Sequence, residues 1–295
     1  MSRIHLNRFE YYEPDNVSEA AGLLATYGGR AHILAGGIDL LPRIRSGGVS
    51  ADCIVNIGRV EGLKRIDFQN DGLYFGAMAT LYELEEESAL KAGYPILYEA
   101  IHQITSVQTK CMGTAIGNIC IATPASDVAT VMMAYDAELT VFGTGGERRI
   151  KLEDFYSGYR KTVLANGEFV TGAFVPVPAP GTGAAFMNRV RTHADIAKIS
   201  VATTIAIEAG VCKAASIALG AVAPTVIRAK AAESLLAGKA VTEELLQGAA
   251  EKAASEGEPI TDFRSTAAYR SDMIEVLVRR ALEKSAERAV QEVGA

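Results

Sequence analysis

The chain has few of the residues that build metal centres. Its 295 residues contain four cysteines, four histidines and no tryptophan. The cysteines, Cys53, Cys111, Cys120 and Cys212, form no CxxC pair, and neither they nor the histidines show the spacing of metal ligands. This spacing excludes a zinc ribbon or an iron–sulfur signature built by this chain alone. We expect free thiols and no metal site.

Long apolar runs and strong charge of one sign are also missing. No run approaches the roughly 20 apolar residues of a membrane helix. The first residues are charged and aromatic, so we expect no signal peptide and a reducing, cytoplasmic location. The net charge is −6 with acidic and basic residues interspersed, so the sequence shows no basic face for nucleic acid.

What is present is a large apolar fraction, 49%, spread over a length that suits two or three packed subdomains. The pattern over residues 1–57 is helix, strand, glycine turn, helix and strand. A second unit covers residues 58–176. A proline-rich linker, 175–183, separates it from a third unit over 184–295. Mixed helices and strands in each unit predict an α+β fold of three parts.

Local patterns place the elements. Asn16 and Glu19 predict a helix start, and Gly28-Gly29 its end. The stretch 111–118 is interpreted as rich in turn residues. Further helices are expected to begin near Ile227, Thr242 and Ala267, the last one with a solvated, charged face. Strands are expected at 32–34, 53–57, 73–75, 138–142, 169–175, 185–191, 199–208 and 214–219.

Two glycine loops could hold an anionic ligand. Ala35-Gly36-Gly37 lies between a predicted strand and a predicted helix from Ile38 to Arg45, where backbone N–H groups can approach a phosphate. The second loop, 113–118, is followed by 124–127 and adds a hydroxyl, an amide and a carboxylate. The GxGxxG nicotinamide fingerprint is absent. From composition alone, both a clasp for a flavin dinucleotide and two plain tight turns remain open.

The two loops also resemble a known family. Residues 33–41, ILAGGIDLL, resemble the first flavin loop of the FAD subunits of the xanthine dehydrogenase family, whose members include the medium subunits of aerobic carbon monoxide dehydrogenase. Residues 108–118, QTKCMGTAIGN, look like the second loop. Further similar motifs, in the same order, run from Phe9 to Leu282, so the resemblance covers nearly the whole chain.

The resemblance implies a fold and a site. It implies two N-terminal α/β subdomains of the vanillyl-alcohol-oxidase/PCMH type, which clasp FAD, and a C-terminal α+β domain of the carbon monoxide dehydrogenase flavoprotein type. No residue is implied as catalytic, and Asp39, Asp127 and Asp195 are interpreted as binding or structural carboxylates. The implied cofactor-binding residues are Ile33, Leu34, Ala35, Gly36, Gly37, Ile38, Asp39, Leu40, Ile104, Thr114, Ala115, Ile116, Gly117, Asn118, Asp127, Val170 and Met187.

Three of these positions depart from the family pattern. Ile116 stands where a glycine is usual, so a side chain occupies a place where backbone normally approaches the cofactor. Ile38 replaces a Thr or His, and Met187 replaces a lysine that many relatives carry beside the flavin. These changes remove one hydrogen-bonding group and one positive charge.

The implied activity is electron transfer in a multi-subunit oxidoreductase. FAD on this chain would relay electrons between the [2Fe–2S] clusters of a small partner and an external acceptor, while a large molybdopterin subunit holds the molybdenum cofactor. The expected assembly is a dimer of heterotrimers. Two alternatives remain, an FAD-free structural subunit of such a complex and a free-standing flavin dehydrogenase of the same fold.

Overall fold

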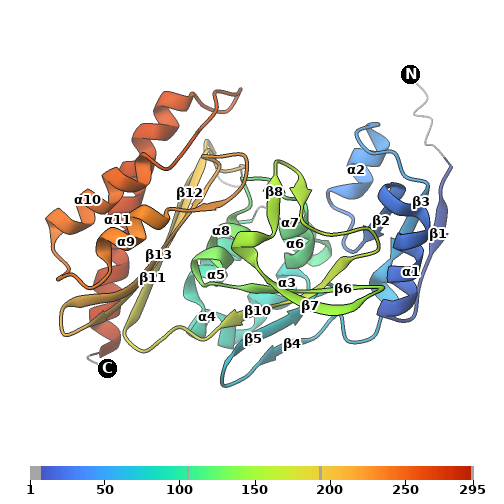
Figure 1. Ribbon diagram of the computed structural model, residues 1–295, viewed down its shortest axis with the longest axis horizontal. Helices are drawn as coiled ribbons and strands as arrows, with labels where there is room; N and C mark the ends of the chain where they lie inside the picture. The colour runs from blue at the N-terminus through green and yellow to red at the C-terminus, as the bar shows by residue number, and fades with distance from the viewer. Residues whose placement is uncertain (1–7, 105, 193–194, 294–295) are drawn as a thin grey trace.

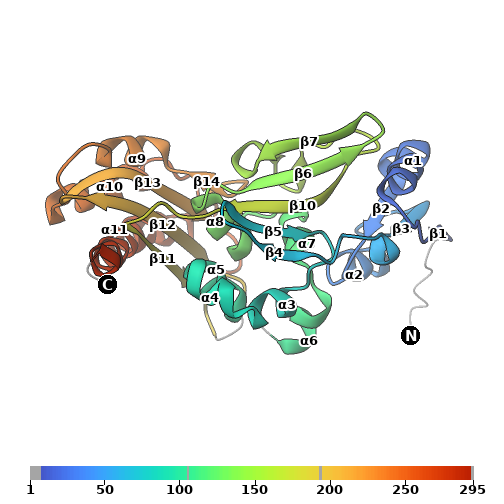
Figure 2. The same cartoon turned by 90° about the horizontal axis from the view of Figure 1, so that it is seen from below.

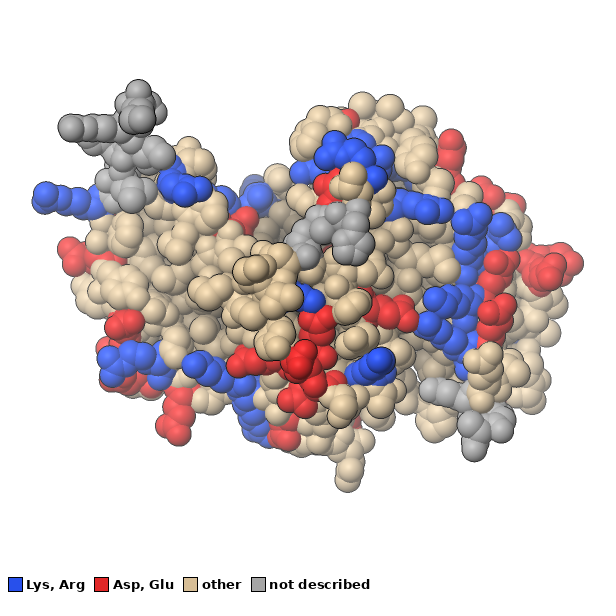
Figure 3. All heavy atoms as spheres, turned by 180° about the vertical axis from the view of Figure 1, so that it is seen from behind, with Lys and Arg blue, Asp and Glu red and all other residues tan. Residues whose placement is uncertain are grey.

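The protein is described by a computed structural model that covers residues 8–104, 106–192 and 195–293. Three β-sheets follow one another along the chain, and the two ends of the chain lie at opposite ends of the molecule (Figure 1). Figure 2 shows the three parts side by side, with the five-stranded sheet in the middle. Figure 3 shows acidic and basic side chains interspersed over one face of the molecule.

The first sheet is parallel, in the order β1-β3-β2, with Tyr12 opposite Val55 and Leu34 opposite Asn56. Helix α1 buries one apolar face, and the Asn16 side chain caps it by accepting from the Glu19 N–H at 2.9 Å. Its elements are β1 (Glu10–Tyr12), α1 (Val17–Tyr27), β2 (Ala31–Leu34), α2 (Leu40–Arg45) and β3 (Cys53–Asn56).

The second sheet is antiparallel, in the order β4-β5-β10-β6-β7. Helices α3 to α6 lie on one side of it (Figure 2). Helix α8 is buried from Val128 to Ala134, which explains its mostly apolar sequence. The strands are β4 (Ile66–Phe68), β5 (Gly72–Gly76), β6 (Glu138–Gly143), β7 (Gly146–Lys151) and β10 (Phe169–Pro176). The helices are α3 (Leu81–Glu86), α4 (Ser88–Gly93), α5 (Pro95–His102), α6 (Val107–Met112), α7 (Ala115–Cys120) and α8 (Asp127–Ala134).

A small β-hairpin and three 3-10 turns complete the two N-terminal parts of the molecule. The hairpin pairs β8 (Tyr156–Gly158) with β9 (Lys161–Thr162) and lies next to α7 in the ribbon (Figure 1). The 3-10 turns are Gly28–Arg30, Ile57–Arg59 and Leu152–Asp154.

The C-terminal sheet, in the order β11-β12-β13-β14, is buried on both faces. One face packs against α9 and α11, on which α10 packs in turn, and Ile205, Ile217 and Leu282 belong to the second apolar core formed there. The other face packs against α8 and joins the main core through Phe186 and Ala202. The elements are β11 (Thr182–Arg189), β12 (Ile199–Glu208), β13 (Val211–Gly220), β14 (Ile227–Arg228), α9 (Lys230–Leu236), α10 (Glu243–Ala254) and α11 (Ala267–Val293).

Ion pairs join the C-terminal part to the rest. Arg228 reaches Asp136 at the end of α8 (2.6 Å) and also pairs with Glu233 of its own domain (2.5 Å). Arg288 of α11 pairs with Glu99 of α5 at 2.9 Å. Because the Arg228 side chain is only 6% exposed, its charge requires these partners.

Several predicted elements differ from the structure. The turn-rich interpretation of 111–118 is wrong, because this stretch contains the end of α6 and the start of α7. The helix expected from Ile227 begins at Lys230, and Ile227 belongs to β14. The short strands β1, β4, β7, β8 and β9 were not predicted, because strands of two to six residues with exposed or half-buried side chains carry no clear alternation.

The solvated interpretation of the last helix is only partly right. The Arg279–Glu283 pair is an exposed i,i+4 contact of 2.7 Å, as expected. Arg270, however, is 4% exposed and donates to Asp262 at 2.8 Å. Two arginines of the same helix thus differ in burial, Arg270 being buried and Arg279 partly exposed, although the sequence pattern does not distinguish them.

Candidate functional site

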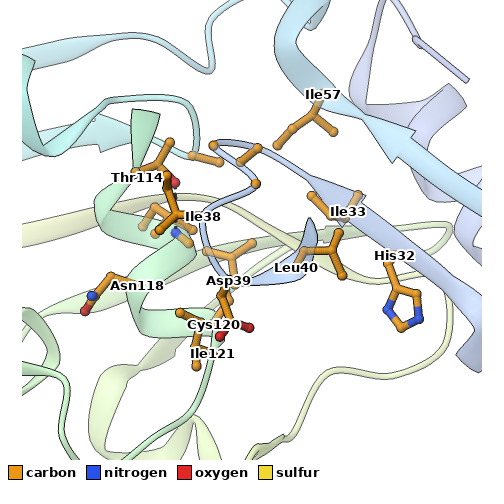
Figure 4. Close-up of a pocket in the computed structure, with 18 of the residues that line it drawn as sticks. His32, Ile33, Ile38, Asp39, Leu40, Ile57, Thr114, Asn118, Cys120 and Ile121 are labelled. Atoms are coloured by element: carbon orange, nitrogen blue, oxygen red, sulfur yellow. Dashed lines mark hydrogen bonds between the residues drawn. The ribbon is translucent and has the colours of Figure 1, made fainter. Parts of the chain in front are cut away.

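A pocket of about 410 Å³ lies between the first sheet and the helices α6 and α7. The loop after β2, residues 35–39, forms one wall, and residues 113–121 form the wall opposite. Figure 4 shows the lining side chains running from Asn118 at one side to His32 at the other. An extended pocket between two glycine loops therefore exists in the folded chain.

The first loop depends on both of its glycines. Gly37 has a φ of +73°, a backbone conformation that favours glycine. Gly36 packs so closely on α6 that a Cβ there would lie 1.8 Å from the carbonyl oxygen of Met112. The sequence Gly-Gly is thus needed for two different reasons, one conformational and one steric.

The N–H groups of this loop are available to a ligand. Leu41 N–H donates to Gly37 O at 3.1 Å, as the first turn of α2 forms. Within the described part of the chain, the N–H groups of residues 36–40 have no backbone or side-chain acceptor. The first amides of a helix lack acceptors within the helix, and such donors suit an anion.

The second loop is held in place by a helix cap and by one backbone hydrogen bond. The Thr114 hydroxyl accepts from the Gly117 N–H at 3.0 Å and so caps α7. A Cβ on Gly117 would lie 2.8 Å from that hydroxyl, so a side chain there would require the hydroxyl to shift. Ala115 N–H donates to Ala79 O at 3.3 Å, which anchors the loop beside α3.

Asn118 supplies a polar side chain to the pocket wall. The Ser126 hydroxyl donates to Asn118 Oδ1, and the same hydroxyl caps α8 by accepting from the Ala129 N–H at 3.0 Å. Because the amide oxygen is already used, the NH₂ group of Asn118 is the end left to donate to a ligand.

The rest of the wall is apolar, with Ile33 and Ile104 on one part and Phe169 and Val170 on another. Ile116 also lines the pocket, but it is 3% exposed and belongs to the main core. Its side chain is therefore packed largely within the protein. Such walls suit the ring systems of an organic cofactor.

Charged side chains lie at the pocket. Asp39 accepts from Arg43 at 3.1 Å and lies 3.7 Å from Arg160. Glu168, another lining residue, pairs with both Nε and an NH₂ of Arg148 at 2.8 Å. The Arg148 guanidinium holds the pKa of Glu168 down to about 2, so this carboxylate is ionised at neutral pH.

The structure brings together most of the predicted site residues. All of the positions implied by the family resemblance line this pocket except Leu34, Ala115, Asp127 and Met187. Leu34 and Ala115 adjoin lining residues in the two loops. Met187 lies on β11, where it packs against the C-terminal core.

Asp127 lies at the start of α8, where the C-terminal domain covers it. One carboxylate oxygen, Oδ2, accepts from the Asn188 amide at 3.1 Å, and the other, Oδ1, is buried without a partner among the described residues. Burial raises the pKa of Asp127 to about 6, although the Asn188 amide and the nearby Ser200 hydroxyl offset part of this effect.

Sequence reasoning missed several lining residues. Arg43 follows the predicted first loop by one helical turn and could have been found from that spacing. The others come from segments without a local signal, because only the fold places them at the pocket. They are Leu24, Ala31, His32, Ile57, Ala77, Leu81, Cys120, Ile121, Leu164, Glu168 and Phe169. Thr109 and Gly113 also line the pocket and lie within the second-loop motif, 108–118, but were not named as site residues.

Comparison with known proteins assigns the class. Residues 7–178 match the family described as FAD binding domain in molybdopterin dehydrogenase, and residues 184–285 match CO dehydrogenase flavoprotein C-terminal domain. The chain is 33% identical to the carbon monoxide dehydrogenase medium chain of Hydrogenophaga pseudoflava over 275 residues, 93% of this chain and 96% of that one.

Solved structures support the same class. A carbon monoxide dehydrogenase structure from Hydrogenophaga pseudoflava superposes with a TM-score of 0.92 at 34% identity and covers 96% of this chain and 99% of that chain. Quinoline 2-oxidoreductase from Pseudomonas putida 86 gives 0.88 at 28% identity, covering 97% and 99%. This chain belongs to the family of FAD-binding medium subunits of the molybdenum hydroxylases.

The predicted family, fold class, FAD-binding domain and oxidoreductase class are therefore confirmed. Across residues 8–104, 106–192 and 195–293, no three His, Cys, Asp or Glu residues gather where they could hold a metal ion. His5 and His193 lie outside this part of the chain. No helix in the same part is both long enough and apolar enough to cross a membrane.

Proposed function

We propose that this chain binds FAD in the pocket between its two glycine loops and serves as the flavin subunit of a molybdenum hydroxylase complex. The observation that carries the proposal is the row of unused N–H groups over residues 36–40, facing a second loop with Thr114 and Asn118. Amide donors suit the diphosphate of a dinucleotide, and the apolar walls suit its rings.

Other contacts support FAD in particular. An extended dinucleotide needs hydroxyl-binding groups as well as phosphate donors. Asp39 and Asn118 line the pocket, and their polar side chains can bond a ribose or ribitol hydroxyl. The unpartnered Oδ1 of Asp127 is buried and lies outside the pocket lining. The residues that would hold FAD are those implied by the family resemblance, with Arg43 and Phe169 added from the pocket wall. Ile38 would supply apolar contact in place of the usual polar group, whereas Met187 lies outside the pocket lining.

The proposed activity is an electron relay. Bound flavin would pair single electrons from an iron–sulfur partner into a two-electron transfer to an external acceptor. The chain's own residues would bind and orient the cofactor. Relatives are medium chains of larger enzymes, so we propose a small [2Fe–2S] subunit and a large molybdopterin subunit as partners, in a cytoplasmic dimer of heterotrimers. Three domains, 1–57, 58–176 and 184–295, remain part of the proposal.

Co-purification with cofactor analysis tests this function. We expect the tagged full-length chain, isolated from its own cells, to carry FAD and to bring down one iron-bearing and one molybdenum-bearing chain. Partners without flavin would instead support the FAD-free structural subunit. A yellow chain that turns over a substrate without any partner would support the free-standing flavin dehydrogenase.

A matched pair of variants ties the flavin to this pocket. Asn118→Leu removes an amide from the wall and keeps the same branched arrangement of side-chain heavy atoms, and we expect the flavin content to fall several-fold. Asn70→Leu makes the same change in an exposed β4–β5 turn, outside the pocket lining, and should leave the flavin content unchanged. Equal flavin content in the two variants would argue against the assigned pocket.

A further inference from the structure

The β8–β9 hairpin contacts the segments that form both loops of the pocket. Tyr156 OH donates to Ile119 O of α7 at 3.4 Å, and the Arg160 N–H donates to Ala122 O just beyond α7 at 2.8 Å. From the same turn, the Arg160 side chain extends to Asp39 of the first loop, with 3.7 Å between Nη1 and Oδ2. One residue thus contacts the end of the second loop through its backbone and the first loop through its side chain.

The turn that presents Arg160 has a defined backbone. Arg160 has a φ of +53° and its hydrogen-bond partner Ala122 a φ of +52°, both left-handed and both without glycine. Such conformations are uncommon for residues with side chains and persist where the surroundings fix them. Figure 4 shows Asp39 extending toward the end of α7, where Cys120 and Ile121 lie.

A second contact joins the loops at their other end. Gly36 lies against Met112 O, at the C-terminal end of α6, just before the second loop. The first loop is therefore tied at residue 36 to the start of the second loop and at residue 39, through Arg160, to its end.

We propose that Arg160 is a positioning residue, and that its pairing with Asp39 sets the separation of the two loops for a ligand that must contact both. The inference rests on the proposed function, because FAD is such a ligand. Arg160 is not assigned a contact with FAD. Arg43 also donates to Asp39, so the carboxylate remains paired within its own helix when Arg160 is lost.

A positioning role differs from a merely structural one because the loss of affinity should depend on which ligand is bound. A ligand that bridges two sites benefits from their fixed separation, whereas a ligand that occupies one site does not. We expect FAD to span both loops, while FMN represents only its flavin part and ADP only its adenosine diphosphate part. Loss of the Asp39–Arg160 contact should therefore weaken FAD more than either half.

The test is titration of the flavin-free full-length chain with FAD, FMN and ADP. For Arg160→Gln and for Asp39→Asn we expect FAD affinity to fall about tenfold, the scale of one coupled pair, and affinity for FMN and ADP to change less than about threefold. The double variant should bind FAD no more weakly than the worse single variant. Arg160→Lys, which keeps a cation near Asp39, should restore part of the affinity.

Arg149→Gln is the matched control. It removes an exposed arginine from β7, where the guanidinium lies 3.9 Å from Glu138, and should leave the affinity for all three ligands unchanged. Equal losses for FAD, FMN and ADP, or none, in Arg160→Gln would overturn the positioning role while the proposed function stands. A wild-type chain that binds no FAD would overturn both.

Discussion

Gly36 and Met112 are in backbone contact across the pocket, although 76 residues separate them in the sequence. A Cβ at Gly36 would lie 1.8 Å from Met112 O and 2.7 Å from its carbonyl carbon. Since neither atom belongs to a flexible side chain, the loops must separate to accept any other residue. This contact fixes how closely the first loop of the proposed flavin pocket approaches the end of α6.

Gly36→Ala should therefore push the two loops apart and lower flavin affinity at least tenfold, with a loss of stability of about 1–3 kcal/mol from overpacking. Gly29→Ala is the control, because a Cβ at Gly29 meets no atom within 4 Å. Flavin titration and thermal unfolding of both variants measure the difference. If Gly36→Ala binds flavin as the wild type does, the close contact is not needed for the site.

The buried carboxyl of Asp127 predicts a pH dependence. Its folded pKa, about 6, lies above the ordinary value of 3.8, so the folded state holds the proton more tightly than the unfolded chain. The stabilisation is complete below pH 3.8 and is lost as the pH rises through about 6, a change of up to about 3 kcal/mol.

Asp127→Asn removes this titration with little change of shape. In the flavin-free protein, we expect the stability of the variant relative to the wild type to increase between pH 4 and pH 7, as measured by denaturant unfolding at a series of pH values. A constant difference between the two proteins over this range would contradict a raised pKa.

The buried guanidinium of Arg228 predicts another effect on stability. Replacing it with methionine leaves Glu233, whose side chain is 10% exposed, as a buried carboxylate without its cation. We expect a loss of about 3–5 kcal/mol in unfolding free energy. Arg279→Met, which removes a half-exposed i,i+4 pair, should cost no more than about 0.5 kcal/mol. Similar losses in the two variants would show that the Arg228 contacts are weak.

Thiol reactivity should separate the four cysteines. Cys111 is exposed, whereas burial raises the pKa of Cys120 to about 12 and also raises the pKa of Cys53 and Cys212. We expect iodoacetamide to modify Cys111 at least about tenfold faster than the other three at mildly alkaline pH, because the thiolate is the nucleophile. Peptide mass spectrometry follows the reaction, and Cys111→Ser should abolish the fast phase. Fast labelling of Cys120, which lines the pocket, would show that its thiol becomes accessible to solvent.

Much of the fold could be predicted from local patterns. The Asn16 cap and Gly28 predicted α1, and the apolar run of 199–208 predicted β12 with its observed ends. Where a helix lacked strong formers, as in α6 and α7, the prediction failed. Thr114 and Gly117 stabilise α7 through one cap, an effect that depends on loop geometry more than on composition.

The residues of the candidate site also fall into two groups, those that local patterns predicted and those that only the structure revealed. Paired glycines at 36 and 37 and the polar residues at 114 and 118 were visible in the sequence, because backbone conformation and hydrogen bonding are local properties. Glu168 and Phe169 were not, because they reach the pocket only through strand pairing far along the chain. Arg160 was not visible either, because only a distant turn brings it to Asp39 of the first loop.

The sequence alone therefore determined which residue types could grip an anionic cofactor, since that chemistry belongs to short segments. Only the tertiary structure decided that Gly36 packs on Met112, that Asp39 faces Arg160 and that Asp127 is buried beneath the C-terminal domain. These relationships arise from packing between segments tens of residues apart, and no local pattern encodes the distance between two loops.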